Sequence, residues 1–575
     1  MQKRSLLEIL KTLRKIISPF FRSPRRRTVW FYCVILLVLS MAVSAVQVWM
    51  SYANRDMMTA LSASRAPEFS VAIGYYVLTI LVAIPIGVFY RFFEERLGLL
   101  WRDWMTGHLI KRYFFRRAYY QMRGNDTVDN PDQRITEDVR NFSAITLSLA
   151  LLLLNSTVTL VAFIGVLWSI STTLVLVLFA YAVTGTVVTA LIGHRLISIH
   201  YNQYQKEADL RYGLVRVRDN SESIAFFRGE ARERLDLVQR LSAVVGNTVS
   251  LIGWNRNLAF FTSGYNYIAL VVPIAVVAPL YFSKEIEFGV IPQAAGAFAQ
   301  VLASLSLIIS QFERLSAYVA GAVRIGGLWD FLHGDEGIGE ELDDDPEIEI
   351  QEGRSLVFKE LTVIPPKSDR ELVTDLNFSL PLSKGLLIMG ASGTGKSSVL
   401  RTVAGLWKSG EGSLQRPQLS KMMFLPQKPY IISGSLRANA LYPQRDSEDI
   451  SDEVIAESLK TVALDSLVER VEGKLETELD WGNILSIGEQ QRLSFARLLL
   501  AKPELAFLDE ATSALDEENE ERLYSLMQTL GCSFVSIGHR STLKKFHSFL
   551  LLIKGGGRWS IEDLPPLAGQ AGCEH

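Results

Sequence analysis

The sequence Gly390-Ala391-Ser392-Gly393-Thr394-Gly395-Lys396-Ser397 follows the apolar run Leu386–Met389 and leads into Ser398-Val399-Leu400, which can form a helix. This is the spacing of a P-loop, in which glycines let backbone N–H groups curl around phosphate. The lysine of such a loop reaches the β- and γ-phosphates, and its last hydroxyl ligates Mg²⁺. The alternative is a chance glycine-rich turn before a helix. We predict an ATP and Mg²⁺ site formed by residues 390–398, with Lys396 on the phosphates and Ser397 on the metal.

A second apolar run, Leu505–Leu508, ends in two carboxylates, Asp509 and Glu510. A buried parallel strand delivers such residues to the carboxyl edge of a sheet, where ligands bind in open α/β folds. We expect Asp509 to hold Mg²⁺ and Glu510 to polarise the attacking water.

Between these two stretches lies Leu485-Ser486-Ile487-Gly488-Glu489-Gln490-Gln491-Arg492, which resembles the signature sequence of ATP-binding cassette (ABC) transporters. The supporting motifs, in the order typical of the family, are Gln427 after Leu425-Pro426, the run Ser513-Ala514-Leu515-Asp516, and His539 in Ser536-Ile537-Gly538-His539-Arg540.

This resemblance implies an α/β P-loop NTPase cassette and a role for each motif. Gln427 would join Ser397 and Asp509 around Mg²⁺, and His539 would contact the γ-phosphate as a catalytic residue beside Glu510 and Lys396. Ser486 and Gly488 would cap the γ-phosphate held by a second cassette, and Glu489 would be among the nucleotide-binding residues. One chain would then supply half of each site, which favours a homodimer.

The signature departs from the family pattern at Ile487, where a glycine is usual, and at Glu489, where a glutamine is usual. Ser486 and Gly488 are kept, so we expect an active ATPase. The segment 363–366 offers no aromatic side chain to stack on adenine, and no residue is assigned to that role.

Composition indicates a membrane half joined to a soluble half, because 49% of the 575 residues are hydrophobic and the mean hydropathy is +0.18. Only three cysteines occur, so no disulfide framework is expected.

Residues 1–27 are strongly basic and contain one acid, Glu8. Nucleic-acid binding is the alternative for this segment, but the apolar run that follows favours a cytoplasmic anchor at the membrane edge. We therefore expect membrane lipid and no nucleic acid among the partners.

Six apolar spans are predicted in residues 28–332. Thr28–Met50 is free of charge over 23 residues, enough to cross roughly 30 Å of hydrocarbon at 1.5 Å per residue. The N-terminus carries no cleavable signal pattern. The remaining spans are 69–90, two within 141–193 that meet at a turn near 169–173, 257–283 and 288–312.

Lys and Arg in the connections set the orientation. The loop after the first span holds only Arg55 and Arg65, and the loop after the fifth only Lys284. The loop after the second span is much more basic, with Arg91, Arg96, Arg102, Lys111, Arg112, Arg116, Arg117 and Arg123 among its residues. Both termini and the cassette are therefore predicted to be cytoplasmic. The inner connections 91–140 and 194–256 are about 50 and 60 residues long, so we expect the membrane helices to continue through them.

These connections resemble the subfamily of peroxisomal fatty-acyl-CoA importers and their bacterial relatives, which are associated with vitamin B12, bleomycin and antimicrobial peptides. The resemblance is carried by Trp101-Arg102-Asp103-Trp104-Met105-Thr106, Tyr119-Tyr120, residues 129–135 and residues 220–230. Asn130-Pro131 predicts a turn before a helix, and Asn220 or Ser221 is a candidate helix cap. By resemblance, residues 221–230 would form a coupling helix that faces a cassette near Gln427.

We predict that the acidic segment 333–350 is a linker. The cassette is predicted at 351–555 and a poorly ordered tail at 556–575. The predicted fold is multidomain: an all-α six-helix transmembrane domain of the ABC exporter type, followed by the cassette. A metal-binding alternative for the acidic linker is weaker.

Two classes of function remain open. The first is an ATP-driven transporter that imports a bulky, partly hydrophilic cargo such as a cobalamin or peptide, with fatty acyl-CoA or lipid transport, or export, as its alternative. The second is an ATP-dependent membrane regulator that transports nothing. Polar residues inside the apolar bundle favour transport, although small polar groups also join helices in lipid. They are Asn155, Thr157, Thr184, Tyr265, Asn266, Gln293 and Gln300. A bacterial inner membrane is expected, with a peroxisomal membrane as the alternative.

Overall fold

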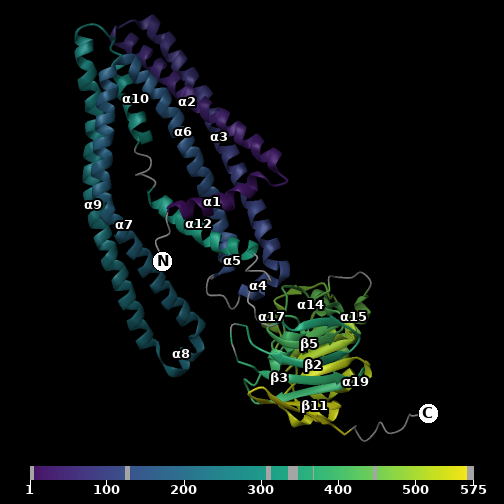
Figure 1. The fold of residues 1–575 in the computed structure, drawn as a ribbon. Coiled ribbons are helices and arrows are strands. Elements are labelled where there is room, and N and C mark those ends of the chain that lie inside the picture. The colour runs from purple at the N-terminus through teal and green to yellow at the C-terminus, as the bar shows by residue number, and fades with distance from the viewer. Residues whose placement is uncertain are drawn as a thin grey trace. The chain divides into compact units, whose positions relative to one another are not determined.

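The computed structural model describes residues 6–122, 128, 130–305, 312–334, 347–366, 368, 370–444 and 450–565. The chain forms two compact units, residues 1–342 and 343–575. Figure 1 shows the first as long helices and the second as two sheets with surrounding helices.

Long apolar helices dominate the first unit. Five are long and apolar enough to cross a membrane, and they contain the first five predicted spans. The sixth predicted span, 288–312, is described only in part, because α10 (Val290–Leu305) is a shorter apolar helix and 306–311 lie outside the described residues. The five long helices are α2 (Arg26–Ser62), α3 (Ala66–Phe114), α6 (Val139–Ile170), α7 (Thr172–Asp219) and α9 (Glu230–Phe282).

The predicted turn near 169–173 is confirmed, since α6 ends at Ile170 and α7 begins at Thr172. The helices also continue through the inner connections, as predicted. Figure 1 shows α7 and α9 running side by side down to α8 (Ser221–Phe227), and Asn247 of α9 donates to the Ile199 carbonyl of α7 at 3.0 Å.

One predicted cap is wrong. Asn220 does precede α8, but its side-chain amide donates to the Arg216 carbonyl at 2.8 Å and makes no cap for α8. Its Nδ2 instead donates to one of the carbonyls that are left without an intrahelical partner at the C-terminus of α7. Pro131 lies in the first turn of α5 (Pro131–Gln133), as expected, and Asn130 precedes it. The first unit also contains η1 (Phe115–Arg117), α4 (Ala118–Gln121), a π-helical turn η3 (Arg134–Asp138) and α12 (Phe312–His333).

The basic N-terminal segment is built into the first unit. It forms α1 (Leu6–Phe21), whose Ile16 and Phe20 are fully buried, and Lys15 pairs with Asp330 of α12. The Phe20 ring stacks on Trp101 of α3 with centroids 5.0 Å apart.

Several of the polar residues predicted inside the bundle join helices to one another. Asn155 accepts from Ser40 of α2 and donates to the Tyr90 hydroxyl of α3 at 2.7 Å. Tyr265 and Tyr181 stack with centroids 4.4 Å apart, and each hydroxyl donates to the other residue's carbonyl. For Asn155 and Tyr265 the structure therefore supports the helix-packing alternative. Thr157 and Thr184 donate to carbonyls of their own helices.

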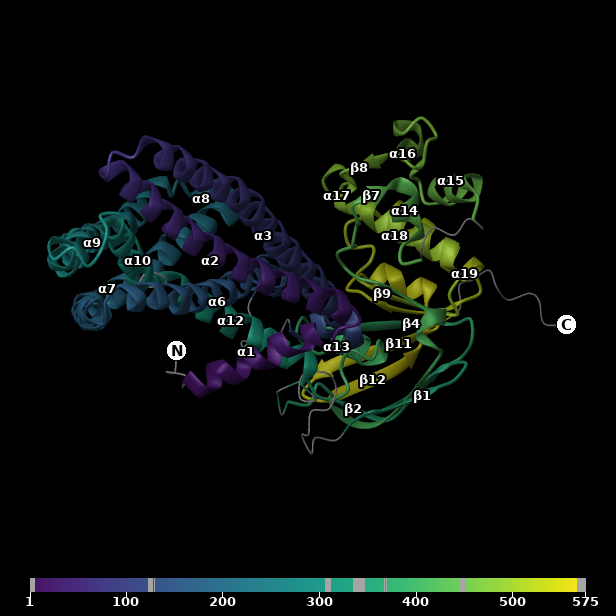
Figure 2. The same cartoon turned by 90° about the horizontal axis from the view of Figure 1, so that it is seen from above.

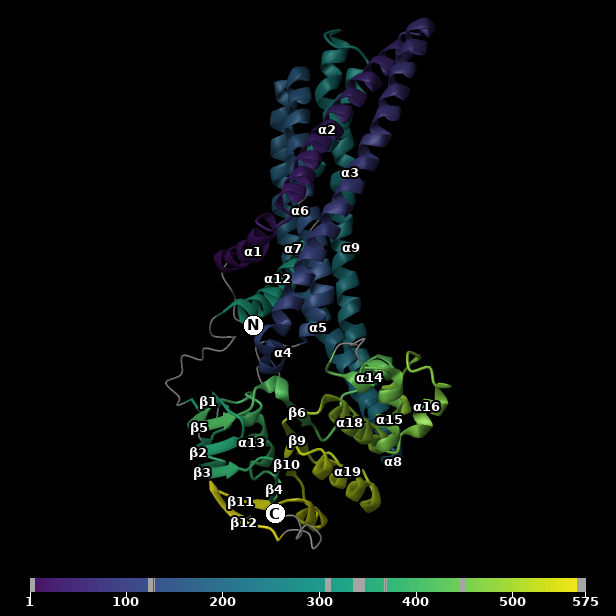
Figure 3. The same ribbon diagram turned by 90° about the vertical axis from the view of Figure 1, so that its right-hand side faces the viewer.

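Two sheets form the core of the second unit, with orders β12-β11-β4-β10-β9-β6 and β1-β5-β2-β3. Figure 3 shows the helices α14, α15, α16 and α18 beside the strands, and Figure 2 shows α14 to α17 gathered in a lobe of their own within this unit. The strands are β1 (Glu349–Glu352), β2 (Leu356–Val363), β3 (Val373–Leu380), β4 (Gly385–Gly390), β5 (Gly410–Arg416), β6 (Met422–Leu425), β7 (Gly434–Ser435), β8 (Glu478–Leu479), β9 (Leu505–Asp509), β10 (Ser533–Ile537), β11 (Phe549–Gly555) and β12 (Arg558–Asp563). The helices are α13 (Lys396–Val403), η4 (Leu419–Lys421), α14 (Leu436–Leu441), α15 (Asp452–Thr461), α16 (Asp465–Arg470), α17 (Trp481–Ile484), α18 (Ile487–Ala501), α19 (Glu517–Thr529) and η5 (Ser541–Phe546).

The predicted tail 556–575 is wrong over its first part. Arg558–Asp563 forms β12 and pairs antiparallel with β11, and Gly556 and Gly557 turn the chain with positive φ. Trp559 and Ile561 pack against the core, which is why the chain continues as a strand past the glycines. Most of the predicted acidic linker (335–346) and the end of the tail (566–575) lie outside the described residues.

Candidate functional site

The P-loop follows a buried strand, as predicted. β4 pairs in parallel with β10 and β11, and its Leu386, Leu387 and Ile388 are buried. The loop needs glycine at Gly393 and Gly395, whose φ values of 78° and 107° favour a residue without Cβ. The chain then enters α13 at Lys396, so the first amides of a helix point into the loop.

Lys396 lies folded into this loop. Its Nζ donates to the carbonyls of Gly390 at 3.0 Å and Ala391 at 2.9 Å. Burial lowers the pKa of Lys396, while Glu510 and Asp509 act in the opposite direction. The lysine is thus held where an anion inside the loop would meet its charge.

Ser397 and Asp509 meet at the carboxyl edge of the sheet. Ser397 Oγ donates to Asp509 Oδ1 at 3.2 Å, and Asp509 is the last residue of β9, opposite Ile537 of β10. Burial raises the pKa of the Asp509 carboxyl, partly offset by the Ser397 hydrogen bond. A hydroxyl and a carboxylate oxygen are therefore placed side by side.

Glu510 brings two other loops to the same edge. Its Oε2 accepts from Gln427 Nε2 at 2.8 Å, and its Oε1 lies 3.3 Å from His539 Nε2. The Glu510 backbone is left-handed, with φ of 49°, and its N–H donates to the Ile537 carbonyl at 3.0 Å. Gln427 and His539, predicted from two separate motifs, thus converge on the carboxylate of Glu510 from a third.

The signature motif starts helix α18 with a capping box. Ser486 N donates to Glu489 Oε2 at 2.8 Å, Ser486 Oγ donates to the same oxygen at 2.7 Å, and Glu489 N points back to Ser486 Oγ at 3.3 Å. These bonds to Ser486 lower the pKa of Glu489. Glu489, the departure from the family pattern, therefore completes the cap. Within the described part of the chain, no hydrogen bond links Ser486 or Gly488 to residues 390–398.

Two residues of the site were given no role from the sequence. Gln491 is almost fully buried; its Nε2 donates to the Gln427 carbonyl at 3.3 Å and to Ser513 Oγ at 3.2 Å, and its Oε1 accepts from Ala514 N at 3.0 Å. Arg540 donates to the Leu515 carbonyl at 3.1 Å, directly after His539. Both stand inside the quoted motifs, which was the available signal, but their partners are distant in sequence.

Comparison with known proteins agrees with this geometry. The family described as ABC transporter transmembrane region 2 matches residues 16–282, and the family described as ABC transporter matches residues 373–513. An uncharacterized ABC transporter ATP-binding protein of Synechocystis sp. is 43% identical over 93% of this chain and 82% of its own length. ABC transporter D family member 2, chloroplastic, of Arabidopsis thaliana is 36% identical over 98% of this chain and 89% of its own.

The chain belongs to the D family of ABC transporters. A human member, the lysosomal cobalamin transporter ABCD4, is 35% identical over 84% of this chain and 85% of its own. The solved structure of a bacterial Atm1-family ABC exporter with ATP bound has the same fold, with a TM-score of 0.73 at 18% identity over 94% of this chain and 95% of that one.

Membership of the D family establishes the general activity. The chain is a multi-pass membrane protein whose cassette binds ATP and couples its hydrolysis to transport. With one transmembrane region and one cassette it is a half-transporter, and half-transporters dimerise. The predicted exporter-type fold is confirmed.

Proposed function

We propose that two copies of this chain form an ATP-driven importer, with two ATP sites that each draw on both copies. The observation that carries this proposal is the division of the motifs within one cassette. Lys396, Ser397, Asp509 and Glu510 gather at one sheet edge, whereas Ser486 is occupied by the cap of α18. Ser486, Gly488 and Glu489 of one copy would then face the γ-phosphate held by the P-loop of the other.

The donor set at the sheet edge fits Mg²⁺. Ser397 Oγ and Asp509 Oδ1 are 3.2 Å apart, and hydroxyl and carboxylate oxygens are the hard ligands that Mg²⁺ prefers. Asp509 and Ser397 would hold the ion, and Gln427 would join them after leaving Glu510. Mg²⁺ bound there would neutralise phosphate charge during transfer.

Within this site, the chain's own residues would position the ATP phosphates and the attacking water and stabilise the negative charge of the phosphates. Lys396 would leave the loop carbonyls for the β- and γ-phosphates, and the amides of residues 390–398 would surround the phosphates. Glu510 would take a proton from the attacking water or orient it, and His539, which lies 3.3 Å from Glu510, would contact the γ-phosphate.

For the cargo, we infer a bulky, partly hydrophilic molecule such as a cobalamin or peptide. The relative described as a lysosomal cobalamin transporter, 35% identical to this chain, supports this choice. A relative described as the inner membrane ABC transporter ATP-binding protein YddA of Escherichia coli, 27% identical to this chain, supports an inner membrane of a bacterium. The basic inner connections support a cytoplasmic location of both termini and the cassette.

A transport assay tests the proposal. The full chain is reconstituted in vesicles with the cassette outward, loaded with radiolabelled cobalamin or a labelled peptide, and ATP with Mg²⁺ is added outside. We expect ATP-dependent export of label from the vesicle lumen, since the lumen corresponds to the outside of the cell, and stimulated ATPase with the true cargo. Vesicles with the Glu510→Gln variant are the matched control. ATP-dependent uptake of label supplied outside empty vesicles would contradict import, and ATPase without movement of any labelled cargo would favour a regulator.

A further inference from the structure

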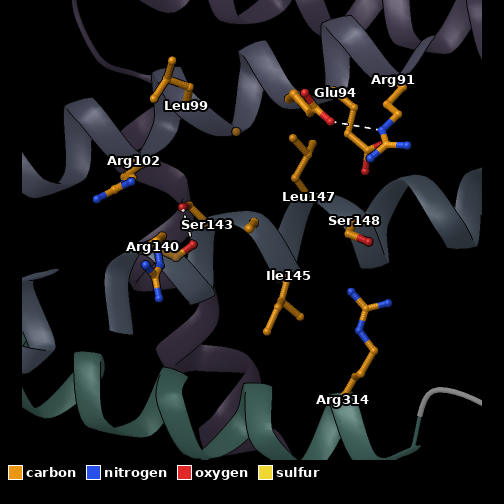
Figure 4. Close-up of a pocket in the computed structure, with 13 residues that line it drawn as sticks. Arg91, Glu94, Leu99, Arg102, Arg140, Ser143, Ile145, Leu147, Ser148 and Arg314 are labelled. Carbon is orange, nitrogen blue, oxygen red and sulfur yellow. Dashed lines mark hydrogen bonds and ion pairs between the residues drawn. The ribbon is translucent and has the colours of Figure 1, made fainter. Parts of the chain in front are cut away.

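A cavity of about 620 Å³ lies between α3, α6 and α12 of the helical unit. Its volume is within the range of about 300 to 1,000 Å³ that is usual for small-molecule sites. In Figure 4, Arg102 and Arg140 lie at one end, Arg91 and Arg314 at the other, and Leu147 and Ile145 between them. The end at Arg102 and Arg140 is thus basic and the middle is apolar, while Glu94 and Glu95 lie with Arg91 at the other end.

The charge inside this cavity is not balanced. Four arginines and two glutamates line it, so the lining has a formal charge of +2. Arg91 is paired with Glu95 at 3.1 Å. The guanidinium groups of Arg102 and Arg140 make no hydrogen bond or ion pair with any described residue. Two guanidinium groups that line one cavity and are unpaired among the described residues can donate hydrogen bonds to an anion with several acceptor oxygens, such as a phosphate.

The position of the cavity along the helices adds an apolar component to the ligand. Arg91 directly follows the charge-free run 69–90, and Arg140 directly precedes the charge-free run 141–193. Arg102 is eleven residues beyond Arg91, roughly 16 Å along α3 at 1.5 Å per residue. Arg102 therefore lies beyond the apolar run of α3 and Arg140 just before that of α6, and Ile145 and Leu147 lie inside the latter run.

We propose that this cavity binds an anionic phospholipid from the leaflet on the side of the basic connections. Its phosphate lies between Arg102 and Arg140, and its apolar part lies along Ile145 and Leu147 toward the hydrocarbon. Anionic lipids are attracted to basic groups at this surface. A bound lipid joins α3 and α6, so it stabilises the helical unit.

The test uses the purified full chain in a neutral detergent, with phosphatidylglycerol or phosphatidylcholine of equal chain length as the probe. Lipid bound per protein is measured by native mass spectrometry, and the melting temperature is measured in parallel. We expect phosphatidylglycerol to bind in preference to phosphatidylcholine and to raise the melting temperature. In the variant with Arg102→Gln and Arg140→Gln, the preference should fall by at least about tenfold, as expected for lost charge-assisted hydrogen bonds.

The control variant is Arg96→Gln, which removes an exposed arginine of the same helix that does not line the cavity. It should keep the preference. A free-phosphate arm separates a lipid from a phosphate ion: inorganic phosphate alone should not reproduce the gain in melting temperature. Equal binding of the two lipids, a preserved preference in the double variant, or full replacement by inorganic phosphate would each overturn the proposal.

If the double variant does not fold, the salt dependence of lipid binding by the parent protein still tests the proposal. Attraction of guanidinium to phosphate is screened by salt. The preference for phosphatidylglycerol should therefore shrink when sodium chloride is raised from 50 to 500 mM, roughly a change in screening length from 14 to 4 Å. An unchanged preference would also overturn the proposal.

Discussion

Gln427 donates a hydrogen bond to Glu510 at 2.8 Å, although 83 residues separate them in sequence. Glu510 also faces His539 at 3.3 Å, so its carboxylate is shared between two loops. Binding of Mg²⁺ and ATP would draw Gln427 toward the metal and His539 toward the γ-phosphate. The same carboxylate would then be released to the attacking water.

Replacing Glu510 by glutamine should separate hydrolysis from binding. Glu510→Gln keeps the size and the hydrogen bonds but removes the charge that draws a proton from water, so ATPase should fall by about 10²- to 10⁴-fold. ATP should still bind and raise the melting temperature, because Lys396 and the loop amides are intact. ATPase and thermal unfolding with and without ATP are the measurements. Lys396→Ala should lose the ATP-dependent gain, and Glu518→Gln, on the exposed start of α19, should behave like the parent. Parent-rate hydrolysis by Glu510→Gln would place activation of water elsewhere.

Mixing two inactive chains should restore activity if the sites are composite. A dimer of one Lys396→Ala chain and one Ser486→Ala chain has one site with both defects and one with neither. Differently tagged chains are co-expressed, mixed dimers are purified through both tags, and their ATPase is compared with that of each variant alone. We expect activity well above both single-variant dimers. Monomeric protein with full ATPase would contradict the composite site.

Impermeant thiol labelling tests the orientation. Single cysteines are placed at Arg55, Lys284, Arg116 or Glu230 after Cys33, Cys532 and Cys573 have been replaced. Positions 55 and 284 should label from outside intact cells, and positions 116 and 230 only after lysis. These expectations follow from the excess of Lys and Arg in the inner connections. Labelling of position 284 only after lysis would reverse the assignment of the loop that precedes α10.

The buried Asp509 should make the nucleotide-free cassette sensitive to pH. Because burial raises its pKa above the unfolded-state value, its contribution to stability is present below about pH 3.9 and is lost as pH rises through the folded-state pKa. Asp509→Asn should therefore melt higher than the parent at pH 7 without nucleotide, and this advantage should shrink toward pH 4. Thermal unfolding across this pH range is the measurement, with Asp563→Asn on the exposed end of β12 as control. A variant that melts lower than the parent at pH 7 would contradict the stated sign. With Mg²⁺ and ATP the order should reverse, since Asn is a poorer ligand for the metal.

The sequence by itself determined the features that depend on local spacing. Glycine positions set the P-loop backbone, β9 could be read from the apolar run before Asp509, and charge-free runs marked the first five spans. Each of these follows from the periodicity or conformational freedom of consecutive residues, so neighbours in sequence suffice to predict it. The same local pattern gave a wrong prediction at β12. Gly556 and Gly557 turn a hairpin there, but as a sequence pattern they predict the end of the cassette.

Only the tertiary structure decided which distant side chains meet. The order β4-β10-β9 brings Ser397 to Asp509, and the loops after β6 and β10 bring Gln427 and His539 to Glu510. The packing of α3 against α6 likewise places Arg102 and Arg140 at one cavity, where neither guanidinium has a hydrogen-bond or ion-pair partner among the described residues. Such contacts depend on strand order and helix packing, because burial of apolar faces sets which elements become neighbours, and no local pattern records that outcome.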